Sequence, residues 1–269
     1  MLELFFFAIG ASFGSFINVA VDRLPSGGSL VRPRSFCDSC SRTLASLDMV
    51  PVLSYLLLRG RCRYCKARIP LRVMLTEAGT GILFTLLYLQ YGFGIEFVVL
   101  CAVVILLLIV ALIDLEHGLI LNRVIYPAIV LLVLLAPFWA ELGSPRSFPI
   151  GTDMVASLLN SLAAGAGAFL VFLAILLAFP AGMGGGDVKL AGLVGLLVGF
   201  PGVLIAVWIA AVVGGLLAIA LLLMGKKGRK DSMPFGPFLA GSALIVFMAG
   251  SQILAKYQEI AANVVGART

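Results

Sequence analysis

Charged residues are scarce in this 269-residue chain, which has 12% Asp, Glu, Lys and Arg and 61% hydrophobic residues. An ordinary soluble domain is about half apolar and about a quarter charged. The scarcity of charge therefore argues against a soluble domain, because most of the chain has too few polar side chains to cover a surface in water. Runs of about 20 apolar residues span the hydrocarbon core of a bilayer. The composition predicts an all-α polytopic membrane protein.

The features of a cleaved signal peptide are also missing. The first apolar segment, residues 4–21, follows Glu3, where a signal peptide would carry basic residues. It ends at Asp22 and Arg23 rather than at a small-residue cleavage site. We therefore expect residues 1–21 to remain as the first transmembrane helix.

Eight apolar runs predict about eight transmembrane helices. The sixth and seventh runs are separated only by Gly199, Phe200, Pro201 and Gly202. Joining them into one helix would invert the later topology. Small residues are dense at 163–168 and in the sixth run, which favours close helix packing. The runs are residues 2–21, 77–92, 97–113, 124–140, 154–180, 189–201, 202–224 and 235–254.

Basic residues collect in two segments. Residues 22–73 carry ten Lys or Arg against three Asp, and the positive-inside tendency places this segment in the cytoplasm. Eight crossings also place loop 225–234 inside, whereas a seven-helix count does not. Loops 92–96 and 141–153 then lie outside and have no basic excess. The basic residues of loop 225–234 are Lys226, Lys227, Arg229 and Lys230.

The net charge of +6 would suggest nucleic acid as the partner of a soluble protein. Because the positive charge is confined to two segments, it instead indicates membrane topology and anionic lipid. We expect no nucleic-acid partner. The predicted organisation is a first helix (1–21), a cytoplasmic segment (22–73) and a transmembrane bundle (74–269). No internal repeat is evident.

Four cysteines have the spacing of a metal site. Cys37-x-x-Cys40 and Cys62-x-x-Cys65 are separated by 21 residues, slightly more than the usual gap of about 15–20. Cytoplasmic thiols stay reduced, which favours a tetrahedral four-cysteine zinc site over disulfides. With all four ligands from the protein, such a zinc is structural and staples the cytoplasmic segment. The alternative is two unrelated turns with free thiols.

Two aspartates lie at the edges of predicted spans. Asp114 ends one apolar run and Asp187 follows a glycine-rich stretch. Ionisable residues at such positions are costly and are functional candidates, and the predicted topology places both at the cytoplasmic face. Two neighbouring carboxyls share a proton, which suits peptide hydrolysis. The ionised member accepts a proton from water while the protonated member polarises the scissile carbonyl.

The residues around Asp187 have expected supporting roles. Gly184 and Gly186 let the backbone approach a substrate closely and adopt dihedral angles that other residues avoid. Lys189 is expected to tune the carboxyl pair, and His117 is interpreted as an interfacial bystander.

Structural alternatives to catalysis remain open on the residues alone. Asp114 is close in sequence to Arg123 and Asp187 to Lys189, so ion pairs or a helix cap would also explain the two aspartates. A transporter with membrane carboxylates is an equal competitor on this evidence.

The segments around both aspartates resemble the type IV prepilin peptidases, within the wider GxGD group of membrane aspartyl proteases. Further boxes resemble the family in the same order along nearly the whole chain. The two aspartate stretches are Gly184-Gly185-Gly186-Asp187-Val188-Lys189-Leu190 and Ala111-Leu112-Ile113-Asp114-Leu115-Glu116-His117. The other boxes are Gly14-Ser15-Phe16-Ile17-Asn18-Val19, Arg34-Ser35-Phe36-Cys37, Leu58-Arg59-Gly60-Arg61-Cys62-Arg63 and Pro234-Phe235-Gly236-Pro237-Phe238-Leu239-Ala240.

The resemblance implies that Asp114 and Asp187 are catalytic and cut the basic leader from prepilins or secretion pseudopilins. The cut follows a glycine at the cytoplasmic face of the bacterial inner membrane. Many members then N-methylate the new N-terminal residue with S-adenosylmethionine, and members with the long cysteine segment are generally bifunctional. No Rossmann-like glycine loop marks a methyl-donor pocket, so cofactor-binding residues stay unassigned.

The chain departs from the family pattern at two places. Asp38 stands where proline often follows the first cysteine, and Ile120-Leu121-Asn122 stands where a proline–aspartate pair is common.

A zinc-dependent scaffold for pilus assembly is a non-enzyme alternative. Preflagellin-type peptidases of the same group generally lack the cysteine segment.

Overall fold

The computed structural model describes residues 1–139, 141–142, 153–180, 182–225 and 234–248. Three predicted features lie outside these residues. They are the inside loop with Lys226, Lys227, Arg229 and Lys230, most of loop 141–153, and the end of the last apolar run.

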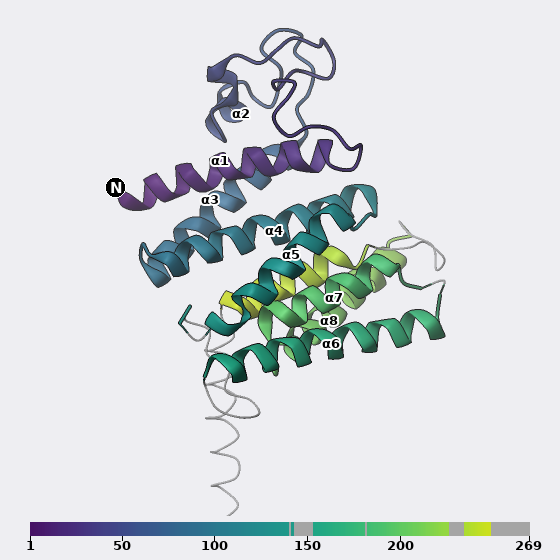
Figure 1. Ribbon diagram of the computed structural model, residues 1–269. Coiled ribbons are helices and arrows are strands. Elements are labelled where there is room, and N and C mark those ends of the chain that lie inside the picture. Colours follow the sequence, from purple (N-terminus) through teal and green to yellow (C-terminus); the bar gives the residue numbers. More distant parts are fainter. Residues whose placement is uncertain (140, 143–152, 181, 226–233, 249–269) are drawn as a thin grey trace, which may run out of the picture. The chain divides into compact units, whose positions relative to one another are not determined.

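The described residues form helices and no strand, which confirms the all-α prediction (Figure 1). Each predicted apolar run corresponds to a helix. The helices are α1 (Leu2–Arg23), η1 (Ser46–Met49), α2 (Leu53–Leu57), α3 (Leu71–Tyr91), α4 (Ile95–His117), α5 (Asn122–Leu135), η2 (Ala136–Phe138), α6 (Met154–Ala178), α7 (Gly185–Val198), α8 (Gly202–Leu223) and an unlabelled helix, Gly236–Met248.

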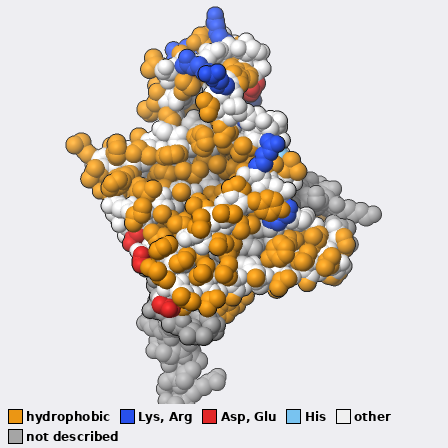
Figure 2. All heavy atoms as spheres, in the orientation of Figure 1, with side chains coloured by type: hydrophobic (Ala, Val, Ile, Leu, Met, Phe, Trp, Pro, Cys, Tyr) orange, Lys and Arg blue, Asp and Glu red, His pale blue; other side chains and the backbone are white. Residues whose placement is uncertain are grey.

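Five helices in the described part of the chain are long and apolar enough to cross a membrane, namely α1, α3, α4, α6 and α8. The prediction of eight spans is therefore not confirmed. Helix α7 has 14 residues, so it rises about 21 Å, less than a hydrocarbon core of about 30 Å. Figure 2 shows hydrophobic side chains over much of the visible surface, as expected of helices that face lipid.

The predicted break between the sixth and seventh runs is confirmed. Helix α7 ends at Val198, and Gly199 adopts a φ of +64°. The buried side chain of Asn160 on α6 holds the turn, because its Nδ2 donates to the Phe200 carbonyl at 3.0 Å and its Oδ1 accepts from the Phe200 N–H at 2.8 Å. Helix α8 then starts at Gly202. The turn is thus stabilised by a polar side chain from a third helix.

The chain forms two compact units, Met1–Ile113 and Asp114–Thr269. In the first unit α1 and α3 pack side by side (Figure 1). Glycine makes their close approach possible, since a Cβ on Gly14 would lie 2.6 Å from the Glu77 Cα. The long segment between these two helices contains all four cysteines of the predicted metal site.

In the second unit α7 is the central helix, with contacts to α5, α6 and α8. Its residues from Leu190 to Leu197 are all buried. A Cβ on Gly195 would overlap the Ala164 carbonyl on α6, and a Cβ on Gly165 would lie 2.7 Å from Leu196. The expected close packing of small residues is therefore confirmed here. It fixes α7, and with it the position of Asp187 at the start of that helix.

Candidate active site and metal site

Asp187 lies in the first turn of α7. The helix begins at Gly185 with Gly184 as its N-cap, so Asp187 is the third helical residue rather than the cap itself. Its Oδ2 accepts the Gly184 N–H at 3.2 Å. A negative charge is favourable at a helix N-terminus, where the macrodipole is positive. Asp187 therefore has a real structural role in starting α7.

Asp114 lies in the last turn of α4 and is 5% exposed. A carboxylate at a helix C-terminus faces the negative end of the macrodipole, which is an unfavourable position. Its Oδ2 accepts the Gly236 N–H at 2.9 Å, from the start of the helix Gly236–Met248. Helix stability therefore gives no reason for an aspartate at this position.

The two aspartates are close enough for their charges to repel each other. Neither forms an ion pair in the described residues, so the predicted alternatives with Arg123 and Lys189 are not found. Lys189 instead donates to Asn122 Oδ1 at 2.8 Å and lies 5.4 Å from the centre of the Tyr126 ring. Lys189 thus ties α7 to α5, and the structure shows no contact through which it would tune the pair directly.

The glycines before Asp187 differ in what surrounds them. A Cβ on Gly186 would lie 2.8 Å from the Ile120 Cβ, whereas a Cβ on Gly185 would meet no atom within 4 Å. The expectation of unusual dihedral angles is wrong for the described glycines of this run, none of which has a positive φ. Gly184, for example, has a φ of −85°. Close approach is the reason for glycine at position 186, and the approaching group is Ile120.

The four predicted metal ligands lie together in the first unit. The Sγ atoms of Cys37, Cys40, Cys62 and Cys65 are all within 4.8 Å of one another. Cys37 Sγ and Cys65 Sγ are 3.7 Å apart. Zinc–sulfur bonds of about 2.3 Å in a tetrahedron place the sulfurs about 3.8 Å apart. The four cysteines therefore form a cluster that could hold a metal ion.

The two cysteine pairs lie on two separate turns with the same backbone geometry, 25 residues apart in the sequence. The N–H of Cys37 donates to Arg42 O at 3.0 Å, and the N–H of Cys62 donates to Ala67 O at 2.8 Å. Both turns pass through a positive φ after the second cysteine and close with an isolated antiparallel bridge. The expectation that the chain has no internal repeat is therefore wrong for this segment. The repeat is one of backbone geometry and cysteine position.

The thiols of this cluster differ in acidity. The backbone N–H groups of Cys65 and Tyr64 lower the pKa of Cys62 to about 7. For Cys65 the N–H of Ala67 lowers the pKa, but desolvation and the other three thiols outweigh it and raise the pKa to about 11. Four neighbouring sulfurs therefore cannot all ionise by themselves. A divalent cation at their centre would remove this conflict.

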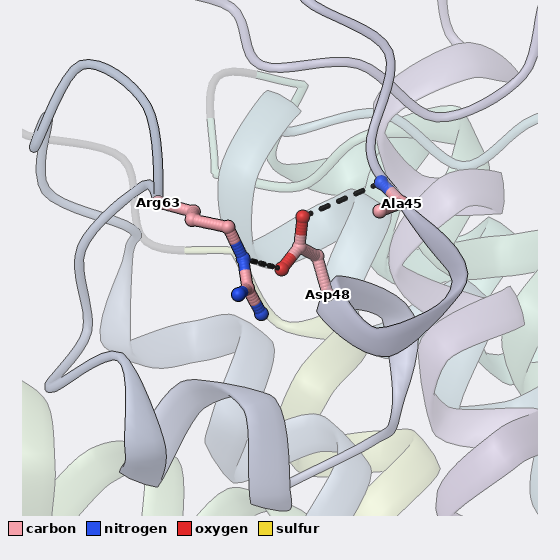
Figure 3. Close-up of polar contacts among 3 residues, drawn as sticks. All are labelled: Ala45, Asp48 and Arg63. Atoms are coloured by element: carbon pink, nitrogen blue, oxygen red, sulfur yellow. Dashed lines mark hydrogen bonds and ion pairs between the residues drawn. The ribbon is translucent and has the colours of Figure 1, made fainter.

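An ion pair joins helix η1 to the second turn of the cysteine segment. Asp48 Oδ1 accepts from Arg63 Nε at 2.6 Å, and Asp48 Oδ2 accepts the Ala45 N–H at 3.3 Å (Figure 3). The Asp48 side chain is 3% exposed. It therefore links η1 to the second cysteine turn.

Gly236 and Glu77 make contacts that the sequence alone does not predict. The backbone N–H of Gly236 donates to Asp114. The one sequence signal for Gly236 is its place in the segment 234–240, which resembles a conserved box of the prepilin peptidases. Glu77 is 5% exposed and accepts the Val52 N–H at 2.7 Å. The position of Glu77 at the start of an apolar run is a signal that could have identified this residue, because an acidic residue in a membrane span is costly.

Comparison with known proteins agrees with this arrangement. Residues 8–91 match the family model described as the bacterial peptidase A24 N-terminal domain, and residues 101–219 match that of the type IV leader peptidase family. A "Prepilin leader peptidase/N-methyltransferase" of Bacillus subtilis (strain 168) is 31% identical over 95% of this chain and 97% of its own length. The chain belongs to the type IV leader peptidase family.

Two further relatives are similar to this chain over most of their own lengths. Proteins with the same name from Pseudomonas putida and Burkholderia pseudomallei (strain K96243) are 29% and 32% identical, over 92% and 84% of their own lengths. The similarity spans the cysteine segment as well as both aspartates. No solved structure matches the chain.

Proposed function

We propose that this integral membrane protein is an aspartyl endopeptidase that removes the basic leader from type IV prepilins or pseudopilins. The observation that carries the proposal is the Asp114–Asp187 pair. Two helices bring these carboxyls together without a basic partner in the described residues, and Asp114 lies where helix stability disfavours it. The names of the relatives supply the substrate class.

The helix dipoles suggest how the pair divides its roles. The start of α7 favours negative charge on Asp187, whereas the end of α4 disfavours it on Asp114. The shared proton then resides mainly on Asp114, although the pair titrates jointly. Asp187 accepts a proton from the attacking water while Asp114 hydrogen-bonds the scissile carbonyl oxygen. After water adds to the carbonyl carbon, the proton held by Asp187 passes to the leaving amine.

The substrate reaches this pair from the membrane. The hydrophobic helix of a prepilin lies in the bilayer, and the leader junction unwinds at the cytoplasmic face of the inner membrane. The ten basic residues of segment 22–73 support this orientation through the positive-inside tendency. The open space at Gly185 leaves room for an extended peptide backbone, while Gly184 and Gly186 position Asp187.

We infer that the cysteine cluster holds a structural zinc ion. Cys37, Cys40, Cys62 and Cys65 supply four sulfurs, the number that fills a tetrahedral site. A filled site leaves no position for a reacting water. The metal therefore stabilises a segment that has little core of its own.

We further infer S-adenosylmethionine-dependent N-methylation of the cleaved product. Similarity to relatives named N-methyltransferase extends over 97% of the length of one of them, including the N-terminal region that carries the cysteines. The residues that bind the methyl donor remain unassigned. A transporter or assembly scaffold is not favoured, because neither explains the family similarity around both aspartates.

The proposal is tested by reconstituting the purified protein with a prepilin and identifying the products by mass spectrometry. Wild type is expected to release the leader after a glycine and, with S-adenosylmethionine, to add one methyl group to the new N-terminus. Asp187→Asn should slow leader release by about 100-fold or more. Normal release by Asp187→Asn would contradict the assignment of this residue.

A further inference from the structure

The segment that contains α2 lies beside the membrane helices of the first unit rather than beyond their end. The Arg72–Asp22 ion pair, at 2.7 Å, marks the polar end of the α1–α3 pair. Glu77 is five residues further along α3, about 7.5 Å deeper by the helical rise. Because the Val52 N–H bonds to Glu77, the chain entering α2 runs alongside the beginning of the apolar part of α3.

Helix α2 turns a row of leucines away from the protein. Leu53, Leu56 and Leu57 have the i, i+3, i+4 spacing of one helix face, and all three are exposed, with Leu57 at 82%. The Tyr55 hydroxyl donates to the Ile69 carbonyl at 3.5 Å, so this residue faces the second cysteine turn. The leucine face therefore has no partner in the described part of the first unit.

Positive charge borders this leucine face. Arg59 and Arg61 follow α2 directly and are exposed. Two of the three acids in segment 22–73, Asp22 and Asp48, are paired with Arg72 and Arg63. Basic residues therefore outnumber the acids that could neutralise them in this segment, and Figure 2 shows Lys and Arg together with hydrophobic side chains over this part of the molecule.

We propose that residues 50–58 form a lipid-contact segment, with the α2 leucines among the acyl chains and Arg59 and Arg61 at anionic headgroups. A leucine face bordered by arginines is the chemistry of an interfacial helix. Its depth beside α3 puts it where the bilayer changes from headgroups to hydrocarbon. The metal-binding turns then sit on the membrane surface instead of extending away from it.

Tryptophan fluorescence in lipid vesicles tests this contact. In a Trp139→Phe/Trp208→Phe background of the full-length protein, Leu57→Trp is reconstituted with brominated phosphatidylcholine and phosphatidylglycerol. Its emission should be blue-shifted and quenched as strongly as that of Trp208, an exposed residue of the membrane helix α8. Ser39→Trp, on the exposed first cysteine turn, is the matched control and should be quenched little.

Other results would overturn the proposal. Emission from Leu57→Trp that is red-shifted and unquenched means that the leucine face is in water, and a blue shift without quenching assigns the face to a protein contact. Leu56→Trp provides a second variant if Leu57→Trp is unstable. Quenching that is the same with and without phosphatidylglycerol rules out the anionic-lipid part. The test uses no prepilin, so its outcome is independent of the proposed peptidase activity.

Discussion

The carboxylate of Asp114 occupies the space next to Gly236 that a side chain would need. A Cβ at position 236 would lie 2.5 Å from Asp114 Oδ2, although the backbone N–H of the same residue donates to that oxygen. Glycine thus provides a hydrogen bond without a clash. Gly236 therefore positions a proposed catalytic group.

Gly236→Ala should therefore displace Asp114 and slow leader release by about 100-fold, the scale expected for a misplacement of roughly 1 Å. Gly241→Ala is the matched control, because a Cβ there meets no atom within 4 Å. Cleavage rates and thermal stability are measured for both variants. A Gly236→Ala protein with normal kcat, or one no slower than Gly241→Ala, would contradict the positioning role.

The role of Gly186, the residue before Asp187, can be tested with a second substitution that compensates for the first. Gly186→Ala should reduce cleavage because its methyl group meets the Ile120 side chain, whereas Gly185→Ala has open space. Removing the opposing side chain, Cβ included, in Gly186→Ala/Ile120→Gly should restore part of the rate. If the double variant is no faster than Gly186→Ala, the glycine is needed for the substrate rather than for packing against Ile120.

At the scale of elements, the α7–α8 turn depends on one amide side chain. Asn160→Ala removes two part-buried hydrogen bonds, one to the carbonyl and one to the N–H of Phe200. The expected loss of stability is about 1–3 kcal/mol. Asn122→Ala, at an exposed position with a bond to Lys189, should cost much less. Thermal unfolding in detergent or lipid compares the two, and equal losses would count against the role of Asn160.

The proposed zinc ion is expected to stabilise the cysteine segment as a unit. Cys62→Ser is expected to lower the metal content from about one ion per chain to near zero and to expose the segment around the cysteines to protease. Cys101→Ser, at a buried position in α4 away from the cluster, should keep the metal. Elemental analysis and limited proteolysis provide the readouts. Full metal content in Cys62→Ser would disprove a four-sulfur site.

Part of this architecture could be predicted from the sequence, because hydropathy and spacing are local signals. The apolar runs located the helices, the Gly199–Gly202 stretch located the α7–α8 break, and the CxxC pairs located the cysteine cluster that could hold a metal ion. The lengths of the helices were harder to predict, because apolar residues continue past the end of a helix into the following turn, as they do after Val198. The 25-residue backbone repeat was missed since only its cysteines are shared.

Contacts between distant segments account for most of what was missed at the site. Nothing near Asp114 in sequence identifies Gly236 as its hydrogen-bond donor, and nothing near Lys189 indicates Asn122 as its acceptor. The charges alone suggested an ion pair between Lys189 and Asp187. Helical geometry instead turns the lysine toward α5.

At the scale of the whole molecule, the second unit brings two helix ends of opposite dipole together. Asp187 lies at a helix start, where negative charge is favoured, and Asp114 lies at a helix end, where it is disfavoured. The pair is therefore suited to holding a single shared proton. Neither aspartate is expected to act alone. We therefore propose that Asp114 and Asp187 form one functional unit.

A double-mutant cycle on leader cleavage tests that claim most directly. Rates are measured in lipid for wild type, Asp114→Asn, Asp187→Asn and the double variant, with metal content confirming intact protein. Each single variant should lose about 100-fold to 10,000-fold in kcat, and the double variant should lose no more than the slower single one. Near-normal cleavage by either single variant, or losses that multiply in the double variant, would contradict the account.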